Sequence, residues 1–444
     1  MVNKSIFKAY DVRGIYPADL NKEAATKIGR AFVRYTGAKN IVVCQDARLS
    51  SPELFRALCK GLLAEGAKVT SIGQMPTECL YFAVGNYDFD GGIMITASHN
   101  PKEYNGFKMM KLGKEQIEWI RGVDLLPIVE VGDFPKKEVD EKIIKNNIVD
   151  DYINYIFNLF DFSEIKKLKV IVDASNGVVG NTLSKIKMPV EIIPLNFKPD
   201  GNFPNHSPNP LEPGASDQIS AEIKKQKADF GFMFDGDADR IFLVDEKGDL
   251  VSADVARLVL AKHFLKKNSK AVIVHDAICS RAVPELIKKW DGVPVRSEVG
   301  FVNIREALIK NKGIMGGELS SHYCFRDYFY MDSGLVAFLL MLQEISLDGR
   351  KVSEIVKELT LYAKSPTINF EVKDKDAVLS KIKEKYKDGN QDFLDGVTVE
   401  YEDWWFNVRA SNTEPLLRLT IEANTQELLE EKKSELSEVI KNEA

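Results

Sequence analysis

Three apolar segments of this chain end in the same dipeptide, Asp-Ala, and this repetition limits what the chain can fold into. A segment with turn or cap residues and helical spacing follows each of them, and then a second short apolar or glycine-bearing run. Strand, helix and strand in alternation predict mostly parallel sheets with crossover helices. The first segments end at Asp46-Ala47, Asp173-Ala174 and Asp276-Ala277, and the second runs span residues 91–96, 228–234 and 311–317.

After about Ser365 the pattern changes to short apolar strands between two charged helices, which predicts a smaller α+β unit with an antiparallel sheet. The length of 444 residues suggests three or four domains. We therefore predict an α/β protein with three similar mixed domains followed by a different fourth one. The predicted domains are residues 1–146, 147–249, 250–365 and 366–444.

Composition excludes several classes of protein. A hydrophobic content of 44% and a charged content of 28% are typical of globular chains. The net charge of −6 and the lack of long basic runs argue against binding to nucleic acid. The longest apolar run, from Gly334, is half of what spans a bilayer, and the N-terminal segment lacks a signal-peptide core. Five scattered cysteines without CxxC spacing fit reduced thiols, so we expect a cytoplasmic protein with no membrane partner.

The polar loops after the second runs of the three repeats would lie at the carboxyl ends of parallel strands, where such sheets bind ligands. In the second of these loops, DGDADR, Asp235, Asp237 and Asp239 alternate, and carboxylates at that density suit Mg²⁺ or Ca²⁺. An EF-hand is excluded because Arg240 stands where its loop needs glycine and because both flanks are strand-like.

In the first loop, Ser98 lies next to His99 but lacks the flanking glycines of a hydrolase elbow. If a divalent ion on the aspartates also reached an oxygen on Ser98, it could polarise a phosphoryl group there. This points to phosphoryl rather than acyl chemistry. Lys108 could serve as acid or base if burial or nearby cations lower its pKa.

Two further segments carry polar side chains suited to a sugar phosphate. Glu318 and Ser320 can hydrogen-bond neighbouring sugar hydroxyls, and His322 could transfer protons. A turn closed by Pro415 places short polar residues between two guanidinium groups, which suits a phosphate dianion. The residues of this cradle are Arg409, Ser411, Asn412, Thr413 and Arg418.

Six motifs in this order resemble the α-D-phosphohexomutases, and within that family the phosphomannomutase/phosphoglucomutase group. They span all four predicted domains. The motifs are FKAYDVRG from Phe7, TASHNPKEYNGFK from Thr96, DGNFPNHSPNP from Asp200, DGDADR from Asp235, GELSSH from Gly317 and RASNTEPLLR from Arg409.

The resemblance implies transfer of a phosphoryl group between the 1- and 6-positions of mannose or glucose phosphates, through phospho-Ser98 and a hexose 1,6-bisphosphate that also activates the enzyme. It implies Mg²⁺ held by Asp235, Asp237 and Asp239 together with the Ser98 phosphate. It also implies an active site in a central cleft, and a monomer or small homo-oligomer. The four domains would then carry, in order, the phosphoserine, the metal, the sugar and the substrate's phosphate.

The same resemblance assigns roles to the remaining site residues. Arg240 helps hold substrate, Tyr10, Arg13 and Lys108 line the catalytic centre, and Lys108 accepts or donates a proton. Glu318 and Ser320 select the sugar, and His322 is a second acid or base. The loop from Arg409 to Arg418 binds the substrate's phosphate.

Three departures from the family pattern concern substrate preference. Ser321 stands where the sugar loop usually has glycine, so a left-handed backbone would be strained there. Ile278 replaces a lysine, and Phe301 replaces the histidine of a Gly-His pair. Phosphoglucosamine mutase, a non-catalytic sugar-phosphate or metal-binding protein, and a phosphoserine phosphatase-like hydrolase remain alternatives.

Overall fold

The structure is a computed structural model that describes residues 2–135, 137, 140, 142–160, 163, 165–411 and 416–442. The chain divides into two compact units. The first unit comprises residues up to Val251 together with Ser321–Ser353. The second comprises Ser252–Ser320 and the residues from Glu354 onward.

The first sheet of the first unit has the order β1-β5-β4-β2-β3-β7, with β6 paired to β5. Strands β4, β2, β3 and β7 run parallel, whereas β5 is antiparallel to β4, because a short connection and no helix joins those two. That connection, residues 96–103, contains Ser98. The strands are β1 (Val12–Ile15), β2 (Asn40–Gln45), β3 (Lys68–Gln74), β4 (Gly91–Ile95), β5 (Tyr104–Leu112), β6 (Ile117–Ile120) and β7 (Ile144–Lys145).

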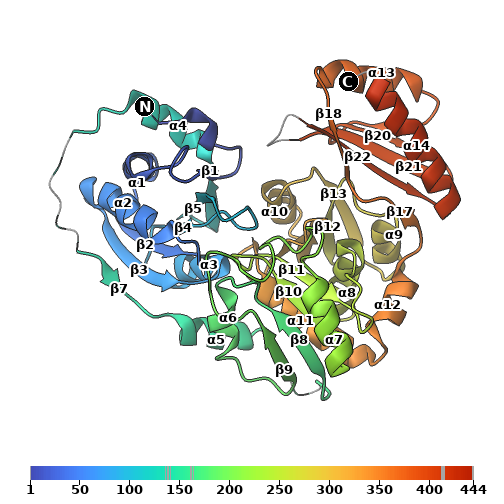
Figure 1. Ribbon diagram of the computed structural model, residues 1–444, viewed down its shortest axis with the longest axis horizontal. Coiled ribbons are helices and arrows are strands. Elements are labelled where there is room, and N and C mark those ends of the chain that lie inside the picture. Colours follow the sequence, from blue (N-terminus) through green and yellow to red (C-terminus); the bar gives the residue numbers. More distant parts are fainter. Residues whose placement is uncertain are drawn as a thin grey trace. The chain divides into compact units, whose positions relative to one another are not determined.

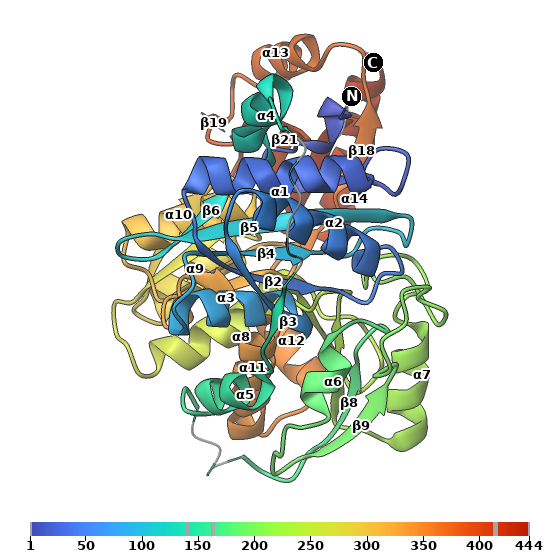
Figure 2. The same ribbon diagram turned by 90° about the vertical axis from the view of Figure 1, so that its left-hand side faces the viewer.

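Helices cover both faces of this sheet, which explains why every residue of β4 is buried. Ile93 and Ile95 pack in the core beneath α1 and α2, which lie side by side in Figure 2. A Cβ on Gly92, which faces the other way, would meet Leu80 and Val84 of α3. The helices are α1 (Lys22–Thr36), α2 (Ser51–Ala64), α3 (Thr77–Asn86) and α4 (Gly122–Val131), after a 3-10 turn at Lys4–Ile6.

The second sheet has the order β11-β10-β8-β9, and the tight turn from β10 to β11 carries DGDADR. All of β10 is buried, and Phe232 and Phe234 pack their rings against Phe338 of α11. These elements are β8 (Lys169–Asp173), β9 (Glu191–Leu195), β10 (Phe230–Phe234), β11 (Ile241–Val244), α5 (Val149–Phe157), α6 (Val179–Leu183), α7 (Asp217–Gln226) and α11 (Gly334–Asp348). A hairpin of β15 (Tyr323–Phe325) and β16 (Met331–Asp332) precedes α11.

The second unit begins with three parallel strands in the order β13-β12-β14 and their crossover helices. The elements are β12 (Val272–Asp276), β13 (Val293–Ser297), β14 (Met315–Gly317), α8 (Ala253–Leu265), α9 (Ala282–Lys289) and α10 (Phe301–Lys310); α12 (Val352–Leu359) follows where the chain returns to this unit.

An antiparallel sheet, β17-β22-β21-β20-β19 with β18 paired to β22, forms the C-terminal part. Helices α13 and α14 pack on one side of it, drawn in orange to red in Figure 1. The bounds are β17 (Ala363–Lys364), β18 (Ile368–Glu371), β19 (Asn390–Asp392), β20 (Val397–Glu400), β21 (Trp404–Ala410), β22 (Leu416–Ala423), α13 (Lys375–Lys385) and α14 (Gln426–Asn442).

The predicted fold class is confirmed: three mixed α/β repeats precede a smaller α+β domain. The sequence prediction missed the middle strand of each repeat, namely β3, β9 and β13. These strands lie at or near sheet edges and contain polar residues or proline, so they lack the continuous apolar run of a central strand. The apolar run from Gly334 folds as buried α11, and no helix in the described part of the chain has the length and apolar character to cross a membrane. The exact domain boundaries stay a prediction.

Candidate active site

The aspartates that end the repeated strands hold the functional loops in place. Asp46 accepts hydrogen bonds from the buried Arg48, whose guanidinium donates in turn to the backbone oxygens of Ser98, at 2.8 Å, and Asn100, at 2.6 Å. In the second unit Asp276 accepts a bond from the backbone N–H of Leu319, 2.8 Å away, next to Glu318. In these two repeats the aspartate of the Asp-Ala dipeptide therefore has a physical role, since it holds the loop at the strand end.

Ser98 has a left-handed backbone with φ of 50°, which few residues other than glycine adopt. The backbone N–H of Ser98 donates to Thr96 Oγ1 at 2.9 Å, and its oxygen accepts the Arg48 bond, so both sides of the residue are held. This conformation turns the hydroxyl toward the DGDADR turn, where Ser98 Oγ donates to Asp235 Oδ2 over 2.8 Å.

The three aspartates of DGDADR converge as predicted. Asp235, Asp237 and Asp239 are buried and each offers a carboxylate oxygen within 4.8 Å of the others. Lys108 Nζ donates to Asp237 Oδ2 at 2.7 Å and pairs with Asp239, and Thr77 Oγ1 also donates to Asp237 at 2.7 Å. Alternate residues of this turn can point to one place because Ala238, between two of the aspartates, has a left-handed backbone with φ of 64°.

The carboxylates have strongly perturbed electrostatics. Burial, together with the neighbouring Asp239 and Asp237, raises the pKa of Asp235 to about 7. Burial opposes the charge on Lys108, but Asp237 and Asp239 outweigh it and raise the pKa of the ammonium. A lowered pKa of Lys108, which the sequence analysis named as a condition for acid or base action, is not found here, because the lysine faces carboxylates rather than cations.

The residues at this turn fit a hard divalent cation. Within the described residues, Asp237 Oδ1 and Asp239 Oδ1 are buried and accept no hydrogen bond. Buried carboxylate oxygens without donors are costly in a protein interior, and a divalent ion with a preference for oxygen ligands would satisfy them.

His99 is a site residue that the sequence analysis did not assign. Its Nδ1 lies 3.2 Å from Ser98 Oγ, so the two neighbours do face each other. Burial and the cations Arg240 and Arg13 lower the pKa of His99 well below its usual value, which keeps the ring neutral. The contact depends on the left-handed turn at Ser98, and sequence spacing gives no signal for it.

The N-terminal motif lies against the same loop. Arg13 Nη1 donates to Asn100 Oδ1 at 2.6 Å and Nη2 donates to Asp11 at 2.5 Å. Burial alone would lower the pKa of Arg13, but Asp11, Asp237 and Asp239 raise it. Tyr10 is half-buried, and its backbone oxygen accepts a bond from Trp119 Nε1 at 2.5 Å.

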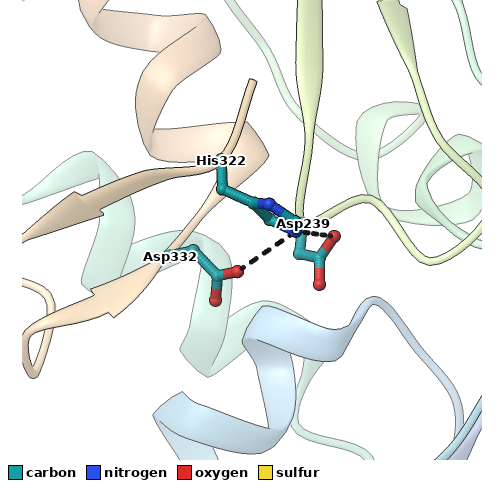
Figure 3. Close-up of side chains that lie close together, drawn as sticks. All are labelled: Asp239, His322 and Asp332. Atoms are coloured by element: carbon teal, nitrogen blue, oxygen red, sulfur yellow. Dashed lines mark ion pairs between the residues drawn. The ribbon is translucent and has the colours of Figure 1, made fainter. Parts of the chain in front are cut away.

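Arg240 and His322 meet at the other side of the DGDADR turn. Arg240 Nε donates to His322 Nε2 at 3.0 Å, and that nitrogen is 3.3 Å from Asp239 Oδ1. Asp332, which the sequence analysis did not identify, also faces His322, with 3.8 Å between Asp332 Oδ2 and His322 Nε2 (Figure 3). Ser321, just before the histidine, is buried with φ of 64°, so the expected left-handed backbone at this position is confirmed.

The sugar-loop residues Glu318 and Ser320 belong to the second unit. Glu318 Oε1 accepts a bond from the backbone N–H of Gly300 at 2.9 Å, and its Oε2 accepts one from Ser320 Oγ at 3.3 Å. The predicted pair is thus formed, and Glu318 also binds the backbone that precedes Phe301 of α10.

The predicted phosphate cradle starts on two neighbouring strands of the second unit. Arg409 of β21 lies directly opposite Arg418 of β22. Burial and Arg418 lower the pKa of Arg409. The backbone N–H of Ser411 donates to the oxygen of Leu416 at 2.8 Å, which closes the strand pair. Asn412 and Thr413 lie outside the described residues.

Four family models match nearly the whole chain. They are the phosphoglucomutase/phosphomannomutase alpha/beta/alpha domains I, II and III at residues 4–118, 150–248 and 252–362, and the C-terminal domain at residues 368–439. The chain is 36% identical to a phosphomannomutase of Vibrio cholerae over 459 aligned positions, covering 99% of each chain. It is 37% identical to a phosphomannomutase of Methanocaldococcus jannaschii, covering 98% of this chain and 97% of the relative.

A solved structure resembles the chain over its full length. It is a phosphoglucomutase/phosphomannomutase family protein from Burkholderia thailandensis, with a TM-score of 0.89 and 31% sequence identity. The match covers 100% of this chain and 98% of that one.

Proposed function

Because the chain belongs to the phosphoglucomutase/phosphomannomutase family, we propose that it moves a phosphoryl group between the 1- and 6-positions of mannose or glucose phosphates, with Ser98 as the carrier. The observation that carries this proposal is the contact of Ser98 Oγ with Asp235 beside three convergent carboxylates. A hydroxyl in that position would carry the phosphoryl group next to the cation that such carboxylates bind.

In the proposed first half-reaction, a free hydroxyl of the hexose phosphate attacks the phosphorus on Ser98. The new O–P bond forms on the sugar, the Ser98 Oγ–P bond breaks, and the hydroxyl's proton passes to a base, for which we propose His322. The product is a hexose 1,6-bisphosphate. After this sugar reverses its orientation, Ser98 Oγ attacks the other phosphoryl group and returns its proton to Lys108. That sugar O–P bond breaks, and the sugar oxygen takes the proton held by His322.

The chain's own charged groups support this chemistry. We propose that Lys108, held as a cation by Asp237 and Asp239, stabilises negative charge on the phosphoryl group and donates a proton to the leaving Ser98 oxygen. Arg240 and Arg13 would bind substrate or phosphoryl oxygens, as guanidinium groups commonly do. Neutral His99, beside Ser98 Oγ, would orient that oxygen.

Mg²⁺ is the metal that we propose for this site, with Asp235, Asp237, Asp239 and an oxygen on Ser98 as its ligands. When bound, it would offset the negative charge of the phosphoryl group in transfer. The donor set of oxygen atoms alone fits this ion better than softer metals.

Residues of the second unit would recognise the rest of the substrate. We propose that Glu318 and Ser320 bind sugar hydroxyls, and that Arg409, Ser411, Asn412, Thr413 and Arg418 bind the substrate's own phosphate. Tyr10 is proposed to line the catalytic centre. A hexose 1,6-bisphosphate would activate the enzyme by recharging Ser98, and we expect the protein to work in the cytoplasm.

A coupled assay tests the function directly. Mannose 1-phosphate and glucose 1-phosphate are supplied with Mg²⁺ and a trace of hexose 1,6-bisphosphate, and formation of the 6-phosphates is followed. Wild type is expected to convert at least one of the two sugars, and Ser98→Ala is expected to convert neither. The exposed control Ser269→Ala should be as active as wild type. Conversion by Ser98→Ala at the wild-type rate would overturn the role of Ser98.

A further inference from the structure

We propose that the first unit contains a second divalent cation site, formed by Asp239, His322 and Asp332, which binds first-row transition ions such as Zn²⁺ in preference to Mg²⁺. The site shares Asp239 with the DGDADR site and adds a nitrogen donor that the DGDADR site lacks.

The geometry of the three side chains suits a single ion. Their ligand atoms all lie within 4.8 Å of one another. His322 Nε2 is 3.3 Å from Asp239 Oδ1 and 3.8 Å from Asp332 Oδ2. Two ligands at zinc-bonding distance in a tetrahedral arrangement are about 3.3 Å apart, so small side-chain movements would complete the site. Figure 3 shows the three side chains converging from the DGDADR turn, the residue before β15 and the end of β16.

Unsatisfied charge at this position provides an independent reason for a cation. Asp332 and Asp239 are 1% and 2% exposed. Among the described residues, the Oδ1 atom of each accepts no hydrogen bond, and Asp332 Oδ2 lies 3.8 Å from His322 Nε2. Lys108 pairs with the other oxygen, Oδ2, of Asp239, and Arg240 Nε lies 3.9 Å from Oδ1. Two buried carboxylates therefore present oxygens that a metal ion would satisfy.

The imidazole determines which metals the site prefers. Nitrogen ligands favour Zn²⁺ and other first-row transition ions, whereas Mg²⁺ and Ca²⁺ take oxygen ligands. Because Arg240 Nε–H donates to His322 Nε2, that nitrogen is unprotonated, the state that binds metal, and its lone pair now points at the guanidinium.

Arg240 is the group that a metal ion must displace. Its guanidinium would give up the hydrogen bond to His322, but its Nε also lies 3.7 Å from Asp235 Oδ2. The arginine would thus keep an anionic partner. This competition predicts that the new site binds a metal ion more weakly than an arginine-free site of the same ligands.

Occupancy of the new site has a functional consequence, which rests on the proposed function. A metal ion on Nε2 takes the lone pair with which His322 would accept the sugar's proton. Zn²⁺ would therefore inhibit the mutase even when Mg²⁺ is saturating. A carboxylate shared between neighbouring ions is a normal feature of two-metal sites.

The first test counts bound Zn²⁺ by equilibrium dialysis and metal analysis, and it does not depend on activity. Wild type is expected to bind two equivalents. Asp332→Asn is expected to bind one equivalent, at the DGDADR site. The double variant Asp235→Asn/Asp237→Asn is also expected to bind one equivalent, at the new site. Asp327→Asn, an exposed aspartate on the same hairpin, serves as the matched control and should bind two. Far-UV circular dichroism and thermal melting establish that each variant is folded.

The second test measures inhibition by Zn²⁺ at saturating Mg²⁺. Asp332→Asn is expected to weaken the inhibition by more than about tenfold, because one ligand of the inhibitory ion is lost. A single Zn²⁺ equivalent in wild type, or two in Asp332→Asn, overturns the proposal. Absence of mutase activity in wild type without Zn²⁺ would contradict the proposed function, whereas the count of bound Zn²⁺ would still test this site.

Discussion

Ser98 Oγ donates a hydrogen bond to Asp235 Oδ2 over 2.8 Å, although 137 positions separate the two residues in the chain. The contact forms because each residue follows the carboxyl end of a buried strand, β4 and β10, in consecutive sheets of the first unit. It joins the proposed phosphoryl carrier to the carboxylates that would bind the metal.

Thr77 positions Asp237 for metal binding, since its Oγ1 donates to Asp237 Oδ2 and its backbone N–H to the oxygen of Asp237. Replacing Thr77 by valine removes the hydroxyl while keeping the side chain's shape. We expect the Mg²⁺ concentration for half-maximal activity to rise about tenfold, with a smaller effect on kcat. A Mg²⁺ activation curve measures this, with exposed Thr360→Val as control. An unchanged curve would contradict the role of Thr77.

Glu78 makes the stability of the fold depend on pH. Burial raises its pKa to about 8 from an ordinary 4.5, while Ser333 Oγ and the backbone N–H of Leu335 donate to its Oε2. Between pH 4.5 and 8 the folded state retains a proton that the unfolded chain releases, so the free energy of unfolding falls as pH rises through this range.

The variant Glu78→Gln mimics the protonated acid and removes this dependence. Relative to wild type, its free energy of unfolding should increase by a few kcal/mol between pH 5 and pH 8. Urea denaturation at the two pH values measures the difference. A difference between wild type and variant that stays constant with pH would show that Glu78 is ionised in the fold.

Ser321 carries backbone strain because its φ is 64°. Replacing it by glycine relieves the strain, whereas alanine keeps the Cβ that causes it. We expect Ser321→Gly to be more stable than Ser321→Ala by about 1 kcal/mol. Chemical denaturation of the two variants measures this difference. Equal free energies of unfolding for the two variants would show that the left-handed backbone at Ser321 does not destabilise the fold.

Arg409 and Arg418 lie opposite each other on neighbouring strands, an arrangement of like charges that disfavours the fold without an anion. Removing Arg409 should therefore weaken substrate binding without a comparable loss of stability. For Arg409→Ala we expect KM for the hexose phosphate to rise between about tenfold and a hundredfold. Steady-state kinetics and thermal melting together test this. A large loss of stability with unchanged KM would identify a structural role instead.

Much of the fold and part of the site could be predicted from the sequence. The alternation of apolar runs and helices indicated three similar α/β repeats, and the spacing of Asp235, Asp237 and Asp239 indicated their convergence. Edge strands such as β9 and β13 could not be recognised, because proline and polar residues interrupt their apolar pattern.

The missed site residues depend on backbone geometry rather than on composition. His99 reaches Ser98 Oγ only because Ser98 is left-handed, and Asp332 faces His322 only because β15 and β16 form a hairpin. Neither residue stands in a motif whose spacing reports such contacts. Lys108 contacts the aspartates of the DGDADR turn, and its charge state depends on these partners in a distant loop.

Phosphoryl carriage by Ser98 can be measured most directly with a labelled hexose 1,6-bisphosphate. The protein is incubated with the labelled compound, separated from it, and then given unlabelled hexose phosphate. We predict one labelled phosphoryl group per chain on Ser98, absent from Ser98→Ala and recovered on the sugar after the second step. Label that never binds to Ser98, or that leaves as inorganic phosphate instead of reaching the sugar, would contradict the proposed mutase.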